Sequence, residues 1–486
     1  MSQQGALAAH RFGLGARPGE IAAASVDPKG WLAAQLNGPA DQPVGTFKTT
    51  GQLVADDRQS AQNRALQRRQ AGQNQQVAQN GARPKAGAQN GQTDVAVTAF
   101  IQPRQQEFRN EMAARFQLGF TTARPFAERL VWFWTNHFTV SVTQARALAF
   151  AGAFEREAIR PYITDTFENM LLAAASHPAM LVYLNNEQSI GPASFEGQRS
   201  KRGLNENLGR ELMELYSLGV DGGYTQADVI AMAKLLTGWS LSPDSPSGFG
   251  FFPARHEPGP QTLRGKTYAD EMAAGGAPLR RARNVMDTPR AGVAAIRDLA
   301  HDPHTARYIA GKFATYFIAD APSPDSVARL EKSFRDTGGN LRALALTAVN
   351  DPAAWTPGPG KLRTPVEYVT AGYRFLGLPS GANAQQQTQS AMATARSMGE
   401  FPMSAPSPKG WPLTSDAWSG PDAVLNRIEW AKQVGARLPR DFNALAVAEQ
   451  GLGPLLTPAT HSAMAAAETP NDAVALLLCS PEFQRR

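Results

Sequence analysis

Apolar residues recur at helical spacing through most of the chain from Ala96 onward, and runs of β-branched residues are short. Apolar side chains three or four residues apart share one face of an α-helix, whereas a half-buried strand needs strict alternation. The abundant Ala, Leu, Arg and Gln residues also favour helix. We therefore predict a mainly α, multi-helix globular domain. The segments with helical patterns are 105–121, 126–138, 150–160, 167–177, 204–218, 226–237, 291–299, 305–317, 327–337, 341–350, 365–376, 391–398, 423–438 and 471–478.

Residues 38–95 differ from the rest because Gln, Asn, Gly and Ala dominate them. Such a composition buries too little apolar surface to offset the conformational entropy of an ordered chain. We expect a disordered low-complexity insert in one domain, and a protein partner is the ligand that it could bind. The predicted division is a helical entry segment at 1–37 that packs on the main domain, the insert at 38–95, and the main helical domain at 96–486. A second Gly- and Pro-rich stretch, 242–278, predicts a loop-rich crossing.

Composition narrows the classes of function. The formal net charge is +6 over 486 residues, and between Asp56 and Arg124 ten basic residues face five acidic ones. Few aromatic residues lie among these bases, so specific nucleic-acid binding is not expected. The single cysteine, Cys479, rules out an intrachain disulfide and a thiolate metal cluster.

The N-terminal residues and the apolar runs of the chain indicate its cellular location. The first ten residues have no basic start and only a four-residue apolar run, too little for a secretory signal. No segment approaches the roughly 20 apolar residues of a membrane span. As written, the sequence predicts a cytoplasmic protein, unless a targeting segment is missing from it.

The segment 204–218 carries the main candidate site. Leu208 and Leu212 belong to an apolar stripe, and Asn207, Glu211 and Glu214 fall along one flank of that stripe. A carboxylate at such a border is paired, or its ionisation shifts. These three residues therefore indicate either a buried structural network or a catalytic or cation-binding site.

An alternative explains part of this pattern without a site. Glu206, Arg210 and Glu214 are spaced i, i+4, i+8, as exposed ion pairs on a helix prefer. This ladder does not account for Asn207 and Glu211. Both interpretations stay open on the sequence alone.

Two histidines are candidate partners for the carboxylates. His137 follows a strongly apolar segment, and His256 lies in the loop-rich crossing. Either could transfer a proton, although neither has metal-binding spacing by itself. The sequence assigns no cofactor and leaves the question of a metal open. It also contains none of the common nucleophile, phosphate-binding or zinc-protease motifs.

Several long motifs, in order along the chain, resemble a bacterial domain-of-unknown-function family, the one numbered eighteen hundred. The matching motifs are Arg11-Phe-Gly-Leu-Gly15, Trp132-Phe-Trp-Thr-Asn-His-Phe138, Asn205-Glu-Asn-Leu-Gly-Arg-Glu-Leu-Met-Glu214, Gly222-Gly-Tyr-Thr-Gln226, Leu236-Thr-Gly-Trp239, Lys361-Leu-Arg-Thr-Pro-Val-Glu367 and Pro406-Ser-Pro-Lys-Gly-Trp-Pro412, with Trp418 beyond them. The segment from Gly38 to Thr93 lies outside the resemblance.

The resemblance implies no established reaction. Many members of that family look exported, which leaves the location of this chain open. Members often carry His where Tyr216 stands and His-Pro where Asp302-Pro303 stands, so a histidine–metal scheme at those positions does not transfer. The resemblance singles out the same polar positions, namely Asn207, Arg210, Glu211, Glu214, His137 and His256.

Two hypotheses follow. In the first, the protein is an enzyme of unassigned reaction in which Glu211 and Glu214 act as acid/base or cation-holding groups in a pocket. Arg210 would orient them or bind an anionic group, and His137 or His256 would exchange protons with them. In the second, the protein is a non-catalytic scaffold or partner-binding protein whose polar motif only locks helices together.

Overall fold

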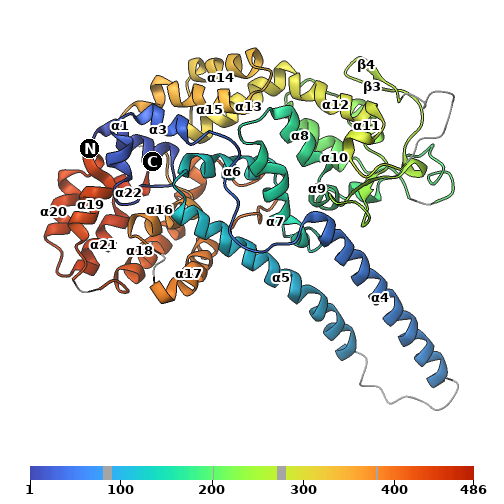
Figure 1. Ribbon diagram of the computed structural model, residues 1–486, viewed down its shortest axis with the longest axis horizontal. Coiled ribbons are helices and arrows are strands. Elements are labelled where there is room, and N and C mark those ends of the chain that lie inside the picture. The colour runs from blue at the N-terminus through green and yellow to red at the C-terminus, as the bar shows by residue number, and fades with distance from the viewer. Residues whose placement is uncertain (80–89, 201, 271–280, 359, 379–380, 440) are drawn as a thin grey trace.

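The computed structural model describes residues 1–486 except 80–89, 201, 271–280, 359, 379–380 and 440, and it describes only the backbone between 71 and 102. The predicted fold class is confirmed, because helices form nearly all of the regular structure (Figure 1). One cluster of buried apolar side chains extends along the chain from Ala8 to Phe483.

The helices are joined by connections of very different length. Those of the first half are α1 Gln3–Leu7, α2 Glu20–Ala24, α3 Pro28–Ala34, α4 Thr50–Gln79, α5 Asn90–Thr121, α6 Pro125–His137, α7 Ala151–Phe154, α8 Phe167–Ser176, α9 Pro178–Tyr183, α10 Asn207–Glu214 and α11 Gln226–Leu235. Those of the second half are α12 Arg290–His301, α13 Pro303–Phe317, α14 Pro324–Asp336, α15 Leu341–Asn350, α16 Pro365–Phe375, α17 Ala384–Ser397, α18 Pro421–Gly435, α19 Ala444–Leu452, α20 Pro458–Ala465, α21 Pro470–Cys479 and α22 Pro481–Gln484.

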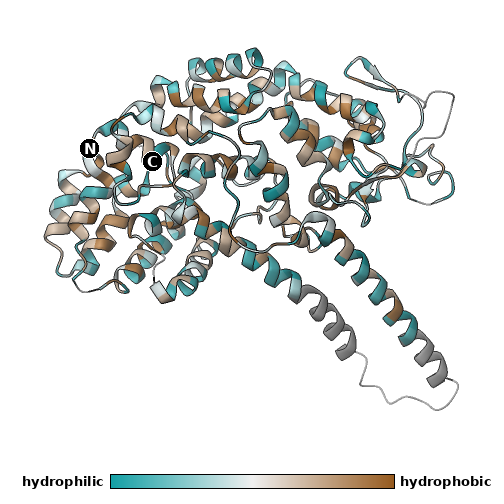
Figure 2. Cartoon of the chain, in the orientation of Figure 1, coloured by the Kyte–Doolittle hydropathy of each residue, from teal (hydrophilic) through white to brown (hydrophobic). Residues whose placement is uncertain are grey.

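The structure describes part of the predicted low-complexity insert, 38–95, and in that part residues 38–49 lie outside helices and strands. Residues 50–79 form α4, and α5 begins at Asn90. Both helices leave the body together as a long hairpin, and α4 is mostly hydrophilic along its described length (Figures 1 and 2). At its base, Thr50, Leu53 and Val54 are buried. Burial of these three residues and the helix propensity of the many Gln and Ala residues stabilise the described part of α4. Residues 80–89 of the expected insert lie outside the described residues.

Side-chain caps account for most helix starts. Thr225 accepts from the backbone N–H of Asp228, whose carboxylate accepts in return from the backbone of Thr225, so α11 begins in a capping box. Thr364 and Glu367 make the same exchange at α16. Asp302 caps α13, with a proline in the first turn. Each cap satisfies backbone donors that a helix leaves unpaired.

Helix α10 is shorter than the predicted segment 204–218. The side chain of Asn205 accepts from the backbone N–H of Asn207 at 2.9 Å, which holds the preceding residues in a turn. At the other end, the Ser217 hydroxyl donates to the carbonyl of Leu212, and the helix ends at Glu214. A β-carbon at Gly209 would lie 2.8 Å from the backbone nitrogen of Ala233, so only glycine lets α10 and α11 pack this closely.

Two short antiparallel hairpins lie at the start of and within the predicted loop-rich crossing, 242–278. In the first, β1 (Trp239–Leu241) pairs with β2 (Phe249–Phe251). In the second, β3 (Gln261–Leu263) pairs with β4 (Lys266–Tyr268) and packs against α11. Residues 271–278 of the crossing lie outside the described residues.

Buried ion pairs connect the core helices. Arg160 is fully buried and donates to Glu128 at 2.7 and 2.8 Å and to Glu155 at 2.7 and 3.1 Å. Arg115 donates to the other oxygen of Glu155 at 2.7 Å. Burial alone would raise the pKa of Glu155, but these two guanidinium groups outweigh it and lower that pKa to about 2. These carboxylates are therefore neutralised within the core and serve its structure.

A second buried cluster joins α6, α13 and α16. Glu367 accepts from Arg129 and, at 2.9 Å, from Arg486, and the Tyr316 hydroxyl donates to it at 3.2 Å. The positive charges of Arg129 and Arg486 overcome the effect of burial and lower the pKa of Glu367 to about 2. Glu367 also serves in the capping box of α16, which ties the start of that helix to the cluster.

Candidate functional site

A cleft of about 960 Å³ lies between α13 and a loop near the end of the chain. Three segments far apart in sequence meet there, and several of the long sequence motifs lie in or next to them. The lining residues are Leu218, Gly219, Val220, Asp221, His304, Arg307, Tyr308, Gly311, Lys312, Thr315, Lys409, Gly410, Trp411, Pro412, Leu413 and Thr414.

Asn136, the penultimate residue of α6, holds the loop 409–414 in place. Its amide nitrogen donates to the carbonyl of Trp411 at 3.0 Å, and its amide oxygen accepts from the N–H of Trp411 at 2.7 Å. The neighbouring Gly410 has φ +83°, and a β-carbon there would lie 2.5 Å from the carbonyl oxygen of Asn136. The loop therefore needs glycine at 410 for both its conformation and this close approach.

His137 connects α6 to the cleft. Its Nδ1 lies 3.0 Å from Nζ of Lys312, and its Nε2 lies 3.2 Å from the carbonyl oxygen of Tyr216. An ammonium group can only donate, and a carbonyl can only accept. Nδ1 is therefore the acceptor and Nε2 carries the proton, so the ring is neutral.

The electrostatics of this pair agree with that arrangement. Burial, and then the charge of Lys312, hold the pKa of His137 well below its usual range, against the opposing hydrogen bond to Tyr216. Burial, and then the charge of Lys409, lower the pKa of Lys312 to about 8. A lysine with such a pKa is an incompletely solvated cation that faces the cleft.

The carboxylate pair Glu211 and Glu214 lies on α10, next to the same region. Both side chains are half-buried. Among the described residues, Glu211 has no hydrogen-bonding or ion-pair partner, and Glu214 interacts with the hydroxyl of Tyr224. Neither glutamate is among the residues that line the cleft. Tyr308 connects the two places, since it lines the cleft and is electrostatically coupled to both carboxylates.

Burial shifts the ionisation of this group of side chains. It raises the pKa of Glu211 to about 7, with a further contribution from Glu214 that Arg210 partly offsets. Burial and then Glu211 raise the pKa of Tyr183 to about 12, and burial with Glu214 and Glu211 does the same for Tyr308. Glu211 is therefore a carboxyl group that exchanges its proton near neutral pH, surrounded by phenols that stay protonated.

Arg210 and Asn207 make their hydrogen bonds outside the carboxylate pair. Arg210 donates to Glu206 at 3.1 Å and to Gln226 at 2.8 Å, so it takes part in the exposed ladder and directs its hydrogen bonds away from Glu211 and Glu214. Asn207 is exposed, and its backbone N–H donates to the side-chain oxygen of Asn205. Arg210 nevertheless stays close enough for its charge to act on Glu211 and Tyr224.

His256 belongs to another network. Its Nδ1 lies 2.8 Å from the carbonyl oxygen of Thr237, and its Nε2 lies 2.7 Å from the carboxylate of Asp270. The next residue, Glu257, pairs with Lys234 at 3.3 Å. The buried imidazole therefore ties the loop-rich crossing to the end of α11.

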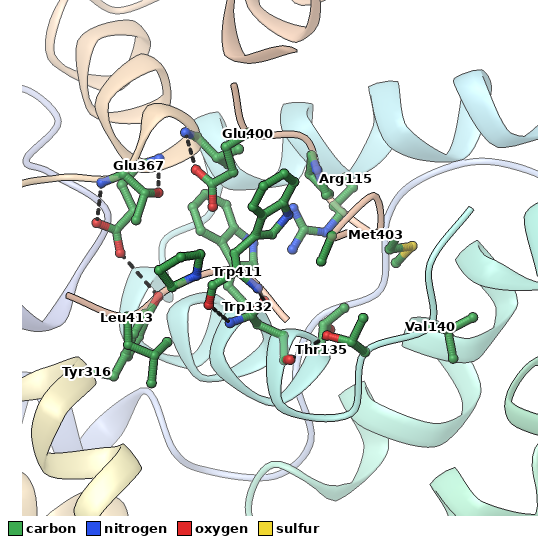
Figure 3. A pocket seen from close by; sticks show the side chains of 17 residues that line it. Arg115, Trp132, Thr135, Val140, Tyr316, Glu367, Glu400, Met403, Trp411 and Leu413 are labelled. Carbon is green, nitrogen blue, oxygen red and sulfur yellow. Dashed lines mark hydrogen bonds between the residues drawn. The ribbon is translucent and has the colours of Figure 1, made fainter. Parts of the chain in front are cut away.

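A smaller cavity, of about 60 Å³, shares Trp411, Pro412 and Leu413 with the cleft. Figure 3 shows Glu367 and Glu400 at this cavity, with Trp411 and Arg115 close by. Burial raises the pKa of Glu400 to about 7, although its carboxylate accepts from the backbone N–H of Val366 at 2.8 Å.

Sequence reasoning missed Lys312 and Tyr308. A signal existed, because Lys312 directly precedes the buried Phe313 and follows Ile309 by three residues, which puts a charge at the edge of an apolar stripe. The tyrosines gave no such signal, since an aromatic residue near a core is ordinary.

The described part of the chain offers neither a metal centre nor a membrane span. Within it, no three His, Cys, Asp or Glu side chains are grouped so that they could hold a metal ion. Every helix of that part is also too short or too polar to cross a membrane.

Comparison with known proteins gives one match. A family model described as "Protein of unknown function (DUF1800)" matches residues 7–485. Neither a curated protein nor a solved structure matches significantly. The match spans both the cleft and the carboxylate pair, as well as the helical hairpin that the sequence motifs left outside.

Proposed function

We propose that this chain, which belongs to the DUF1800 family of proteins of unknown function, is an enzyme that uses Glu211 as a general acid–base group. Glu211 supplies or removes a proton at a substrate bound next to α10. The reaction class is proton transfer to or from a reacting oxygen or nitrogen, as in hydrolysis or elimination.

One observation carries the proposal. Glu211 is half-buried, is uncompensated by any ion pair among the described residues, and has its pKa raised to about 7 by burial and by Glu214. Other carboxylates of the core, such as Glu155 and Glu367, are neutralised by arginines. Leaving a carboxyl unpaired costs stability, and such costs are typical of catalytic groups.

The neighbours of Glu211 have distinct roles in this proposal. Glu214 stays close enough to disfavour a second negative charge and so holds a proton on Glu211. Tyr308 and Tyr183 keep their phenolic protons and can donate hydrogen bonds to a substrate. His137 fixes the position of Lys312 through its neutral ring and does not exchange protons directly with Glu211.

A second candidate function rests on the helical hairpin. The arm formed by α4 and α5 extends from the body (Figure 1), and its described side chains on α4 beyond Val54 are mostly exposed. A scaffold that binds a protein partner through this arm would need no catalytic carboxylate. The scaffold function does not explain why Glu211 is unpaired with a raised pKa, and we therefore place this function second.

The test is an activity screen with a matched pair of variants. Wild type is assayed against chromogenic esters, glycosides and phosphoesters, and each activity found is repeated with Glu211→Gln and Glu206→Gln. Both substitutions remove one carboxylate from the same short segment, but Glu206 is already paired with Arg210. We expect Glu211→Gln to lower kcat by about 10²-fold or more, and Glu206→Gln to leave it nearly unchanged.

The proposal fails if Glu211→Gln retains wild-type kcat in every activity found. It also fails if wild type turns over no member of the panel while a protein partner binds to the hairpin arm with unaltered affinity for Glu211→Gln. The second result would favour the scaffold.

A further inference from the structure

One face of α13 forms a wall of the cleft. Arg307, Gly311 and Thr315 are spaced i, i+4, i+8 and all line it, together with Tyr308 and Lys312. A β-carbon added at Gly311 would meet no atom within 4 Å. Because Gly311 has no side chain, the wall formed by α13 is recessed at this position, near Arg307 and Lys312.

The cleft is lined by more positively charged than negatively charged side chains. Arg307, Lys312 and Lys409 line it, and Asp221 is the single carboxylate among the lining residues. Among the described residues, neither Arg307 nor Lys409 forms an ion pair, and Lys312 donates to a neutral imidazole instead of a carboxylate. Three cationic side chains and one carboxylate thus line the cleft.

Lys312 and Lys409 also repel each other. The charge of Lys409 adds to the effect of burial in lowering the pKa of Lys312, which means that the two ammonium groups sense each other across the cleft. An ammonium has three N–H donors, and within the described part of the chain Lys312 uses one of them, toward His137. Two donors remain for a ligand, and a negative charge there would offset the repulsion.

We propose that this cleft binds the anionic group, a phosphate or a carboxylate, of a small organic substrate through Lys312, Arg307 and Lys409. A volume of about 960 Å³ exceeds what one anion needs and fits a whole small molecule. The inference rests on the proposed function, because it takes the cleft next to Glu211 as the place where the substrate lies. Tyr308, shared by the cleft and the carboxylate pair, connects the bound anion to the proton-carrying group.

The test is calorimetric titration of the full chain with two probes, inorganic phosphate and glucuronate, which present the two anionic groups. The variants are Lys312→Met and Lys409→Met, with Lys332→Met as the control. Lys332 is an exposed lysine of α14 paired with Asp336, so its replacement changes the net charge equally and leaves the cleft intact. A fourth variant, Gly311→Leu, keeps every charge and fills the hollow in the wall.

We expect wild type to bind one probe or both, and the one that binds more tightly identifies the anionic group. Lys312→Met weakens this binding by about tenfold or more, and Lys409→Met weakens it by severalfold. Gly311→Leu also weakens it, which covers the case in which Lys312→Met does not fold. Lys332→Met leaves the affinity unchanged.

The inference is overturned if wild type binds neither probe, or if affinity is the same in wild type, Lys409→Met and Gly311→Leu. Glu211→Gln separates this result from the proposed function, because that variant keeps all three cations. If Glu211→Gln binds the anion but has full activity, the acid–base role is wrong and the anion site stands. If it loses activity and no variant alters anion binding, the anion site is wrong and the acid–base role stands.

Discussion

Lys312 Nζ lies 3.0 Å from Nδ1 of His137, so this half-buried lysine is held by a neutral acceptor and not by a carboxylate. The same imidazole donates to the carbonyl of Tyr216 at the end of the α10 segment. One neutral ring therefore positions the cation of the cleft relative to the segment that carries Glu211 and Glu214. A carboxylate in place of His137 would neutralise Lys312 and remove its affinity for an anion.

Anion binding should depend on pH through Lys312. Its pKa is lowered to about 8, so the ammonium loses its proton, and binding weakens, as pH rises from about 7 to about 9. Lys409, Arg307, Asp221 and His304 also line the cleft, so the comparison with Lys312→Met isolates the contribution of Lys312; burial keeps His137 and Tyr308 from titrating in that range. Titration with sulfate, whose own charge is constant there, measures the effect. A profile that is flat in wild type, or equally steep in Lys312→Met, would contradict it.

Asn136→Ala should loosen the loop 409–414. The variant loses both hydrogen bonds to the backbone of Trp411, and the freed loop no longer holds Lys409 at the cleft. We expect a loss of about 1–3 kcal/mol in the free energy of unfolding and a severalfold weaker anion affinity. Denaturant unfolding and calorimetry measure the two effects.

The control for this loop variant is Asn350→Ala, which removes an exposed hydrogen bond within α15. It should change neither quantity appreciably. Unchanged anion affinity in Asn136→Ala would show that the loop does not position Lys409.

Arg160→Met should destabilise the core strongly. It leaves Glu128 and Glu155 as buried carboxylates with much of their compensation removed, which costs about 3–5 kcal/mol in unfolding free energy. Arg210→Met removes a partly exposed ion pair and should cost less than about 1 kcal/mol. Denaturant unfolding of the two variants measures both values, and similar losses for them would contradict the assignment of Arg160 to the structural core.

Local signals in the sequence were sufficient for much of the fold. The capping box from Thr225 to Asp228 and the helix start at Asp302-Pro303 involve residues at most three positions apart, so local sequence is sufficient to form them. The short span of α10 was missed, because its start depends on Asn205 and its end on Ser217 acting against the helical period of the leucines. Composition did not predict helix α4, whose base is buried against the body.

The candidate site was predictable only in part. The border position of Glu211 followed from helical periodicity, and the structure places it half-buried among tyrosines. That Arg210 pairs with Glu206 was the alternative that the sequence left open, and the structure contains this pair. The contact of His137 with Lys312 joins residues 175 positions apart, and no local pattern encodes such a contact.

Glu211 should make stability depend on pH. The folded state holds its proton up to about pH 7, whereas an ordinary glutamate with a pKa of 4.5 in the unfolded state has lost it. Between these values the folded state binds more protons, so the free energy of unfolding falls as pH rises. We expect wild type to lose about 1–2 kcal/mol more than Glu211→Gln between about pH 5 and about pH 8.

Glu111 and Glu400 also have pKa values raised to about 7, by burial, and they contribute the same trend in both proteins. The quantity to compare is therefore the difference in unfolding free energy between wild type and Glu211→Gln. Denaturant unfolding at each pH measures it. Parallel curves for the two proteins would show that Glu211 is ionised at neutral pH in the folded state.

The most direct measurement is the pKa of Glu211 itself, from the carbon-13 chemical shift of its side-chain carboxyl followed through a pH titration, with Glu211→Gln to assign the signal. The account predicts a midpoint of about 7, and a lower midpoint when Glu214→Gln removes the neighbouring charge. A midpoint near the ordinary value of 4.5, unaltered in Glu214→Gln, would contradict the account.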